Sequence, residues 1–186
     1  EHVSSRQLAD LALMWKEQNK EGNIGVAYTY NEPLVGWEFV RDTARLVREY
    51  GMFNVLVTNG TASLEVLEEL LPWIDAMNID LKGFREEYYR RLGGDLETVK
   101  AFIMRAAGSS HVELTTLIVP GENDSLKDME AQAKWIAGLR PSIPLHITRF
   151  FPRYRMRDRE ATDVEQLYRL AGTAGKYLEK VYVGNV

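Results

Sequence analysis

Short apolar runs alternate with amphipathic helical segments along the chain, and this alternation constrains the fold more than any other feature. Between the runs, apolar residues recur at the spacing of one helix face, as Leu8, Leu11 and Trp15 do, and Lys20-Glu21-Gly22 is expected to end that first helix. The strand-like runs lie at 23–29, 53–57, 76–82, 112–119 and 144–150, with a less distinct sixth at 181–183. Regular alternation of this kind predicts a parallel sheet with right-handed crossovers. We therefore expect an α/β fold that is too short for a closed eight-stranded barrel, with outer helices and a single domain over residues 1–186.

The composition is that of an ordinary globular protein, and it argues against several classes of function. The 186 residues are 45% hydrophobic and 27% charged, with a net charge of −4. This charge argues against a general nucleic-acid binder, and the chain has no apolar run of roughly 18 residues that would span a membrane. The absence of cysteine excludes a disulfide, a zinc–thiolate site and a cysteine nucleophile within these residues. We expect neither nucleic acid nor membrane as a partner, and a cytoplasmic location.

Polar residues follow the apolar runs at the points where the strands would end. The clearest example is Gly25–Pro33, where Val-Ala-Tyr suits a strand and Asn31-Glu32-Pro33 suits a turn. The other tips are Thr58-Asn59, Asp80-Leu81-Lys82, Pro120-Gly121-Glu122-Asn123 and Pro152-Arg153-Tyr154. Because parallel strands end on one rim, we expect these tips to form a ligand cradle.

Alternation within the strands indicates an inner polar face. In the run 76–82, Met77, Ile79 and Leu81 point to one side, while Asn78, Asp80 and Lys82 point to the other. His146 and Thr148 also share one face of their strand. Burying these polar groups in an apolar core would cost free energy. The pattern therefore favours a barrel with a polar interior over a sheet covered by helices on both faces.

Several of these segments, in this order, resemble one family. They are Tyr28-Thr-Tyr-Asn-Glu-Pro33, Val57-Thr-Asn-Gly60, Ala76-Met-Asn-Ile-Asp-Leu-Lys82 and Ile118-Val-Pro-Gly121. Together they resemble the radical S-adenosylmethionine (SAM) enzymes related to pyruvate formate-lyase activating enzyme, in the branch that accompanies AmmeMemo-system proteins. The resemblance implies a partial (β/α)6 barrel whose [4Fe-4S] cluster is held by a CxxxCxxC motif. It also implies reductive cleavage of SAM to a 5′-deoxyadenosyl radical, which abstracts hydrogen from a protein glycine or a small molecule.

The resemblance assigns expected roles to individual residues. Asn31-Glu32-Pro33 stands where the family has a Gly-Gly-Glu stretch, so Glu32 would accept hydrogen bonds from the SAM ammonium. Thr58 and Asn59 match a tip that approaches the methionyl group, although Val57 replaces an acidic residue of the family there. Lys82 would neutralise the SAM carboxylate, and Asp80 would orient Lys82. Val119 matches a backbone position that contacts the adenine, and Tyr154 stands where the family often has a histidine. The expected cofactor-binding residues are Asn31, Glu32, Thr58, Asn59, Asp80, Lys82, Val119 and Tyr154.

The cysteine motif of the family is absent from these 186 residues. In the family it precedes the first helix seen here, so we expect the first strand and the cluster loop to lie upstream of Glu1. On this interpretation the sequence is a fragment that has no metal ligand or catalytic residue of its own and is inactive in isolation. A sheet that lacks its first strand leaves an open edge, which predicts edge-mediated dimerisation.

Simpler interpretations exist for the same residues. Glu32 can be a helix-start carboxylate, Thr58-Asn59-Gly60 a plain turn, and Asp80 with Lys82 an internal ion pair. His146 is more typical of a hydrogen-bonded barrel residue than of a metal ligand. The arginines at 149, 153, 155, 157 and 159 suggest a solvated loop, with docking of an acidic partner as the alternative.

Two other functions remain open from the sequence. The chain could be a cluster-free α/β binding or scaffold module, in which case SAM would not stabilise it. It could also be a lyase or aldolase that uses Lys82 as an amine nucleophile, although the neighbouring Asp80 favours the charged lysine.

Overall fold

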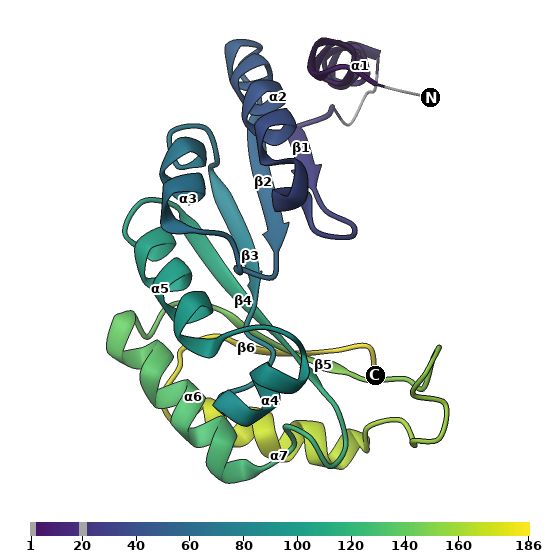
Figure 1. Ribbon diagram of the computed structural model, residues 1–186, viewed down its shortest axis with the longest axis vertical. Helices are drawn as coiled ribbons and strands as arrows, with labels where there is room; N and C mark the ends of the chain where they lie inside the picture. The colour runs from purple at the N-terminus through teal and green to yellow at the C-terminus, as the bar shows by residue number, and fades with distance from the viewer. Residues whose placement is uncertain (1–2, 19–21) are drawn as a thin grey trace. The chain divides into compact units, whose positions relative to one another are not determined.

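The computed structural model describes residues 3–18 and 22–186, in which strands and helices alternate as predicted (Figure 1). The predicted helix end at Lys20-Glu21 lies outside these residues. The strands are β1 (Gly25–Tyr28), β2 (Phe53–Thr58), β3 (Ala76–Asp80), β4 (His111–Ile118), β5 (Leu145–Arg149) and β6 (Val181–Gly184). The helices are α1 (Ser5–Gln18), η1 (Pro33–Gly36, a 3₁₀ turn), α2 (Trp37–Glu49), α3 (Leu64–Leu70), α4 (Glu86–Arg91), α5 (Leu96–Ala107), α6 (Leu126–Leu139) and α7 (Val164–Ala174).

The six strands are arranged in the sheet in chain order, from β1 to β6. The strand pairs β1–β2, β2–β3, β4–β5 and β5–β6 are parallel, which confirms the predicted parallel sheet. In the described residues β1 and β6 do not pair, so the sheet is not closed. The less distinct sixth run is a strand in register with β5, where Val181 lies opposite Leu145.

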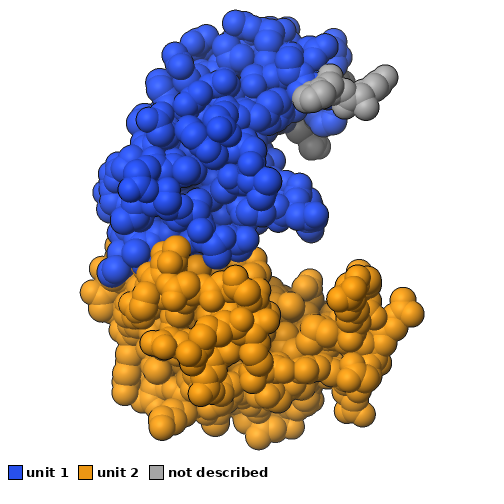
Figure 2. All heavy atoms as spheres, viewed as in Figure 1, with its two compact units in different colours: residues 1–79, 101–111 blue, residues 80–100, 112–186 orange. Residues whose placement is uncertain are grey.

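The chain divides into two compact units (Figure 2). Unit 1 comprises residues 1–79 and 101–111, and unit 2 comprises residues 80–100 and 112–186. The single domain expected over residues 1–186 stays a prediction.

Unit 1 is built around the strands β1 to β3, with α2 packed on β1 and β2 and with α1 against α2 (Figure 1). The buried side chain of Asn54 donates hydrogen bonds to the carbonyls of Ala44 and Trp73, at 2.9 and 3.0 Å. Its amide oxygen accepts a hydrogen bond from the hydroxyl of Tyr28 at 3.0 Å. Burial raises the pKa of Tyr28, so this tyrosine stays a neutral donor. The polar side chain in the middle of β2 is therefore satisfied inside the unit.

Unit 2 contains β5, β6 and most of β4, with α6 against α7 and α7 against β5 and β6 (Figure 1). On one face of the sheet, alternate side chains such as Leu114, Leu145 and Ile147 are fully buried. On the other face, His146 and Thr148 are partly exposed, which confirms that these two residues share a face. The open face of this sheet is therefore free to line a cavity.

Helices α5, α6 and α7 each begin directly after a polar side chain that caps them. Ser125 accepts a hydrogen bond from the amide of Asp128 at the start of α6, and Asp95 accepts one from the amide of Thr98. Asp163, and not the neighbouring Thr162, caps α7. The hydroxyl of Thr162 is buried, where it donates to the carbonyl of Ile118 at 2.6 Å and accepts from the amide of Phe150 at 3.0 Å. These bonds join the ends of β4 and β5.

Candidate functional site

In unit 1, Glu32 links the tip of β1 to the tip of β2. It is the N-cap of η1, and Oε1 accepts a hydrogen bond from the amide of Leu34 at 3.1 Å. The hydroxyl of Thr58 donates to Oε1 and the amide of Asn59 donates to Oε2, both at 2.7 Å. The helix-start interpretation of Glu32 is therefore correct, but it is only part of the role of this residue, because the carboxylate also holds the next strand end.

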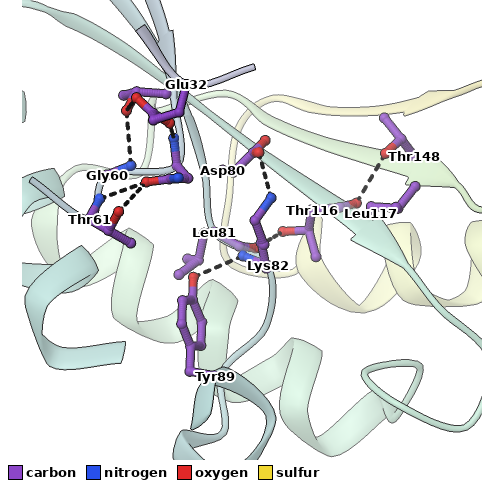
Figure 3. Close-up of polar contacts among 12 residues, drawn as sticks. Glu32, Gly60, Thr61, Asp80, Leu81, Lys82, Tyr89, Thr116, Leu117 and Thr148 are labelled. Atoms are coloured by element: carbon purple, nitrogen blue, oxygen red, sulfur yellow. Dashed lines mark hydrogen bonds and ion pairs between the residues drawn. The ribbon is translucent and has the colours of Figure 1, made fainter. Parts of the chain in front are cut away.

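The loop after β2 is ordered by its own side chains. The buried hydroxyl of Thr58 accepts a hydrogen bond from the amide of Gly60, which has a φ of 68°. The side-chain oxygen of Asn59 accepts hydrogen bonds from both the amide and the hydroxyl of Thr61 (Figure 3). The turn interpretation of Thr58-Asn59-Gly60 is thus confirmed. A carboxylate has about four acceptor sites, so the three bonds to Glu32 leave capacity for about one further donor.

In unit 2, Asp80 and Lys82 form the predicted ion pair at the end of β3. Lys82 Nζ lies 2.7 Å from Asp80 Oδ2, and both side chains are more than a third exposed (Figure 3). The backbone of Lys82 is fixed on both sides, because its amide donates to the Tyr89 hydroxyl at 3.0 Å and its carbonyl accepts from Asn123 at 2.7 Å. Burial raises the pKa of Tyr89, which keeps that hydroxyl protonated. The Lys82 side chain therefore extends from a backbone that is held by hydrogen bonds on both sides.

The turn after β4 is held by Asn123, a buried residue that sequence reasoning did not single out. Its side-chain oxygen accepts a hydrogen bond from the amide of Val119 at 2.7 Å. Its side-chain nitrogen donates to the carbonyls of Lys82 and Leu117, at 2.7 and 2.8 Å. The only sequence signal for this role was its place in the Pro120–Asn123 tip. Asn123 ties the end of β4 to the segment that carries Lys82.

A cavity of about 600 Å³ lies in unit 2 at these strand ends. Three of the residues predicted for ligand binding line it, namely Asp80, Lys82 and Val119. The wall also includes the polar residues Thr115 and Thr148 and the apolar residues Leu117, Phe150 and Met156. The charged lining residues also include Arg91 and Glu122, and a cavity with both charged and apolar lining suits a small molecule that has polar and apolar parts.

Tyr154 is placed differently from these residues. It is 75% exposed and does not line the cavity, and the guanidinium of Arg155 lies 5.2 Å from its ring centroid. The role expected for Tyr154 in cofactor binding stays a prediction.

His146 has the hydrogen-bond partner expected for a barrel histidine. Its Nε2 lies 2.6 Å from Glu113 Oε2, and its ring stacks on Tyr182 with a centroid distance of 5.2 Å. Among residues 3–18 and 22–186, no group of three or more His, Cys, Asp or Glu side chains is placed to hold a metal ion.

The eight predicted site residues fall into two groups. Asn31, Glu32, Thr58 and Asn59 belong to unit 1, where Asn31 is exposed and Glu32 accepts hydrogen bonds from both Thr58 and Asn59. Asp80, Lys82, Val119 and Tyr154 belong to unit 2. A ligand shared by both groups stays a prediction.

For the part of the chain that the structure describes, none of the helices has the length and apolar character needed to span a membrane.

Comparison with solved structures finds the same fold. A domain of pyruvate-formate lyase-activating enzyme from Bacteroides vulgatus superposes with a TM-score of 0.74 and 21% identity, covering 87% of this chain and 99% of that domain. Streptococcus suis SuiB bound to S-adenosylmethionine superposes with a TM-score of 0.77 and 11% identity, covering 99% of this chain and 44% of SuiB. At these identities the matches establish the fold alone, and they confirm the predicted partial barrel.

Comparison of sequences identifies the family. The chain is 40% identical over 165 residues to an uncharacterised protein of Methanocaldococcus jannaschii, which covers 87% of this chain. The chain spans about half the length of that relative, 49%. A family model described as "Radical SAM superfamily" matches residues 1–133. The chain therefore belongs to the radical SAM superfamily.

Proposed function

We propose that this chain is the SAM-binding part of a radical SAM oxidoreductase of the activating-enzyme type, in the branch that accompanies AmmeMemo-system proteins. When bound, SAM and a [4Fe-4S] cluster supply the reductive cleavage that yields a 5′-deoxyadenosyl radical for hydrogen abstraction. The substrate would be a glycine of a partner protein or a small molecule. The family match supports the proposal, and the observation that carries it is the cavity lined by Asp80, Lys82 and Val119.

The residues of unit 2 fit SAM. A volume of about 600 Å³ lies within the range of roughly 300–1,000 Å³ that small-molecule sites occupy. Leu117, Phe150 and Met156 offer an apolar wall to a purine, and the Thr148 hydroxyl oxygen, whose proton goes to the Thr116 carbonyl, would accept a hydrogen bond from a ribose. Lys82 would pair with the SAM carboxylate, with Asp80 holding the ammonium in place.

Taken by itself, the Glu32 cluster of unit 1 would act as an acceptor for an ammonium group. Glu32 keeps capacity for about one more donor, and an ammonium is a suitable one. The bonds from Thr58 and Asn59 hold the carboxylate in one orientation, so the acceptor is preorganised for that donor.

The same residues do not fit an iron–sulfur cluster. The 186 residues contain no cysteine, and thiolates are the usual ligands of such clusters. The cluster ligands of the proposed enzyme would have to come from outside these 186 residues.

SAM binding to the 186-residue protein tests the first half of the proposal. We expect equilibrium dialysis to detect SAM binding that weakens about tenfold in Lys82→Gln and in Asp80→Asn, since each change removes one charge of the pair. Lys127→Gln is the matched control, because Lys127 is exposed and forms no ion pair in the described residues. Equal SAM affinity in all four proteins, or no binding at millimolar SAM, would overturn the assignment of this cavity.

Catalysis is tested separately on the full-length protein. After anaerobic reconstitution with iron and sulfide, addition of a reductant should yield 5′-deoxyadenosine from SAM. An intact cluster that yields none would defeat the catalytic claim, whereas the SAM-binding result would still stand.

A further inference from the structure

The segment between the end of β5 and α7 is the most basic part of the chain. Residues 149–160, here called the arginine loop, contain five arginines, Asp158 and Glu160, for a net charge of +3. Because the whole chain carries −4, the remaining residues carry −7. The loop is therefore a local cationic surface on an otherwise acidic protein.

Two of the five arginines fix the loop in place. Arg149 Nε donates to the carbonyl of Thr162 at 2.8 Å, and its guanidinium lies 4.8 Å from the ring centroid of Phe151. Arg159 Nη2 donates to Glu122 Oε1 at 2.8 Å, which ties the loop to the turn after β4. Met156, in the middle of the loop, lines the cavity. The loop is thus seated at the edge of the cavity by internal contacts.

The other three arginines are not used in this way. Arg153, Arg155 and Arg157 are exposed, and none forms an ion pair with the described residues. Asp158 and Glu160 lie close in sequence, yet they too form no ion pair with these arginines. Three exposed arginines therefore lie within residues 153–157, on either side of the cavity-lining Met156, and none of them is paired with a carboxylate of the described residues.

Arginines at the base of the loop and next to it already bind a carboxylate of the protein itself. The carboxylate of Glu122, only 18% exposed, is held by Arg159 on one side and by Arg91 on the other. Arg85 also contacts the carbonyl of Glu122 and pairs with Asp128 at 2.8 Å. Guanidinium groups bind carboxylates through paired, charge-assisted hydrogen bonds. The anchored arginines of this region already use that chemistry.

We propose that Arg153, Arg155 and Arg157 dock an acidic segment of a partner protein beside the cavity. Charge complementarity selects this partner, because the three unpaired guanidinium groups match a short run of Asp or Glu side chains. This inference goes beyond the proposed function and does not depend on SAM binding.

Single-stranded nucleic acid is the competing occupant, since the loop also carries the exposed rings of Phe151 and Tyr154. Two observations favour the acidic peptide. The −7 charge on the rest of the chain repels a long polyanion. In addition, each ring has a guanidinium over it, Arg149 on Phe151 and Arg155 on Tyr154, so stacking platforms are partly covered.

Fluorescence anisotropy with two labelled probes tests the proposal. The probes are a Glu-Gly repeat peptide and an oligouridylate, each titrated with the 186-residue protein at low salt. The loop variant is Arg153→Gln with Arg155→Gln and Arg157→Gln. The control variant is Lys127→Gln with Arg140→Gln and Lys180→Gln, three exposed cations of unit 2 that form no ion pair in the described residues. Both variants change the net charge equally.

We expect the acidic peptide to bind the wild type and the control with affinities within about twofold, and the loop variant about tenfold more weakly. Peptide binding that the loop variant and the control lose equally would show a net-charge effect and overturn the proposal. Binding of the oligouridylate without the peptide would overturn it in favour of nucleic acid. SAM affinity and the thermal unfolding of the loop variant should match those of the wild type, which separates this test from that of the proposed function.

Discussion

Glu32 and Asn59 are 27 residues apart in the chain, yet a 2.7 Å hydrogen bond joins the amide of Asn59 to Glu32 Oε2. The carboxylate that the sequence places at a strand end is therefore a brace between two strand ends as well as a candidate ligand contact. Its structural role and its ligand role can be separated by experiment, because a hydrogen-bond partner of Glu32 can be removed while the carboxylate is kept.

Glu32→Gln removes the charge that three hydrogen bonds share. We expect it to lower the free energy of unfolding by about 2 kcal/mol, since hydrogen bonds to charged groups contribute more than neutral ones. Thr58→Val, which removes one partner of Glu32 and keeps the carboxylate, should cost about 1 kcal/mol. Urea unfolding measures both. Only Glu32→Gln should weaken SAM binding in equilibrium dialysis. An equal loss of SAM affinity in both variants would mean that Glu32 acts solely as a brace.

Asn123→Ala should be among the most destabilising polar substitutions in unit 2. It leaves the amide of Val119 and the carbonyls of Lys82 and Leu117 without their partner, so we expect a loss of about 3 kcal/mol in urea unfolding. Asn31→Ala is the control, because Asn31 is exposed and should change stability by less than about 0.5 kcal/mol. A similar small effect for both variants would contradict the role given to Asn123.

Tyr89 predicts a dependence of stability on alkaline pH. Burial raises its pKa in the folded protein above the ordinary value of 10.0, so the folded state retains a proton that the unfolded state releases. The stability that the protonated Tyr89 contributes to the folded state is complete below pH 10 and is lost as the pH rises through the pKa of Tyr89 in the folded protein. Unfolding at pH 8 and pH 11 should therefore show a smaller loss of stability in Tyr89→Phe than in the wild type. Tyr28 and Tyr88, whose pKa values burial also raises, add losses of the same sign in both proteins, so the difference between the two proteins reports the removal of the Tyr89 hydroxyl.

The edge strand β1 predicts association at high protein concentration. β1 pairs with β2 on one side and is the last strand of the sheet on the other, and such edges pair with other chains. We expect sedimentation equilibrium to detect a dimer that Ala27→Lys weakens, because a charge on an exposed edge residue opposes pairing. Leu126→Lys, at an exposed site on α6, is the control. A monomer at every concentration would refute this expectation.

The order of elements was predictable from the sequence because hydrophobic periodicity is local. Alternation in the run 76–82 correctly placed Met77, Ile79 and Leu81 inside, and turn chemistry correctly placed Gly60 after β2. Parallel pairing followed from the alternation of strands and helices. Helix caps were less certain, since Thr162 and Asp163 are both suitable and burial of the Thr162 hydroxyl decided between them.

The sequence alone determined which residues stand at the strand ends, including Glu32, Lys82 and Val119. Only the tertiary structure decided what those residues contact, for example that Glu32 binds Thr58 and Asn59, and that Asn123 fixes the backbone beside Lys82. The physical reason is that patterning along a chain reports burial within one element. A hydrogen bond across two strand ends depends on register and packing, which no local pattern encodes.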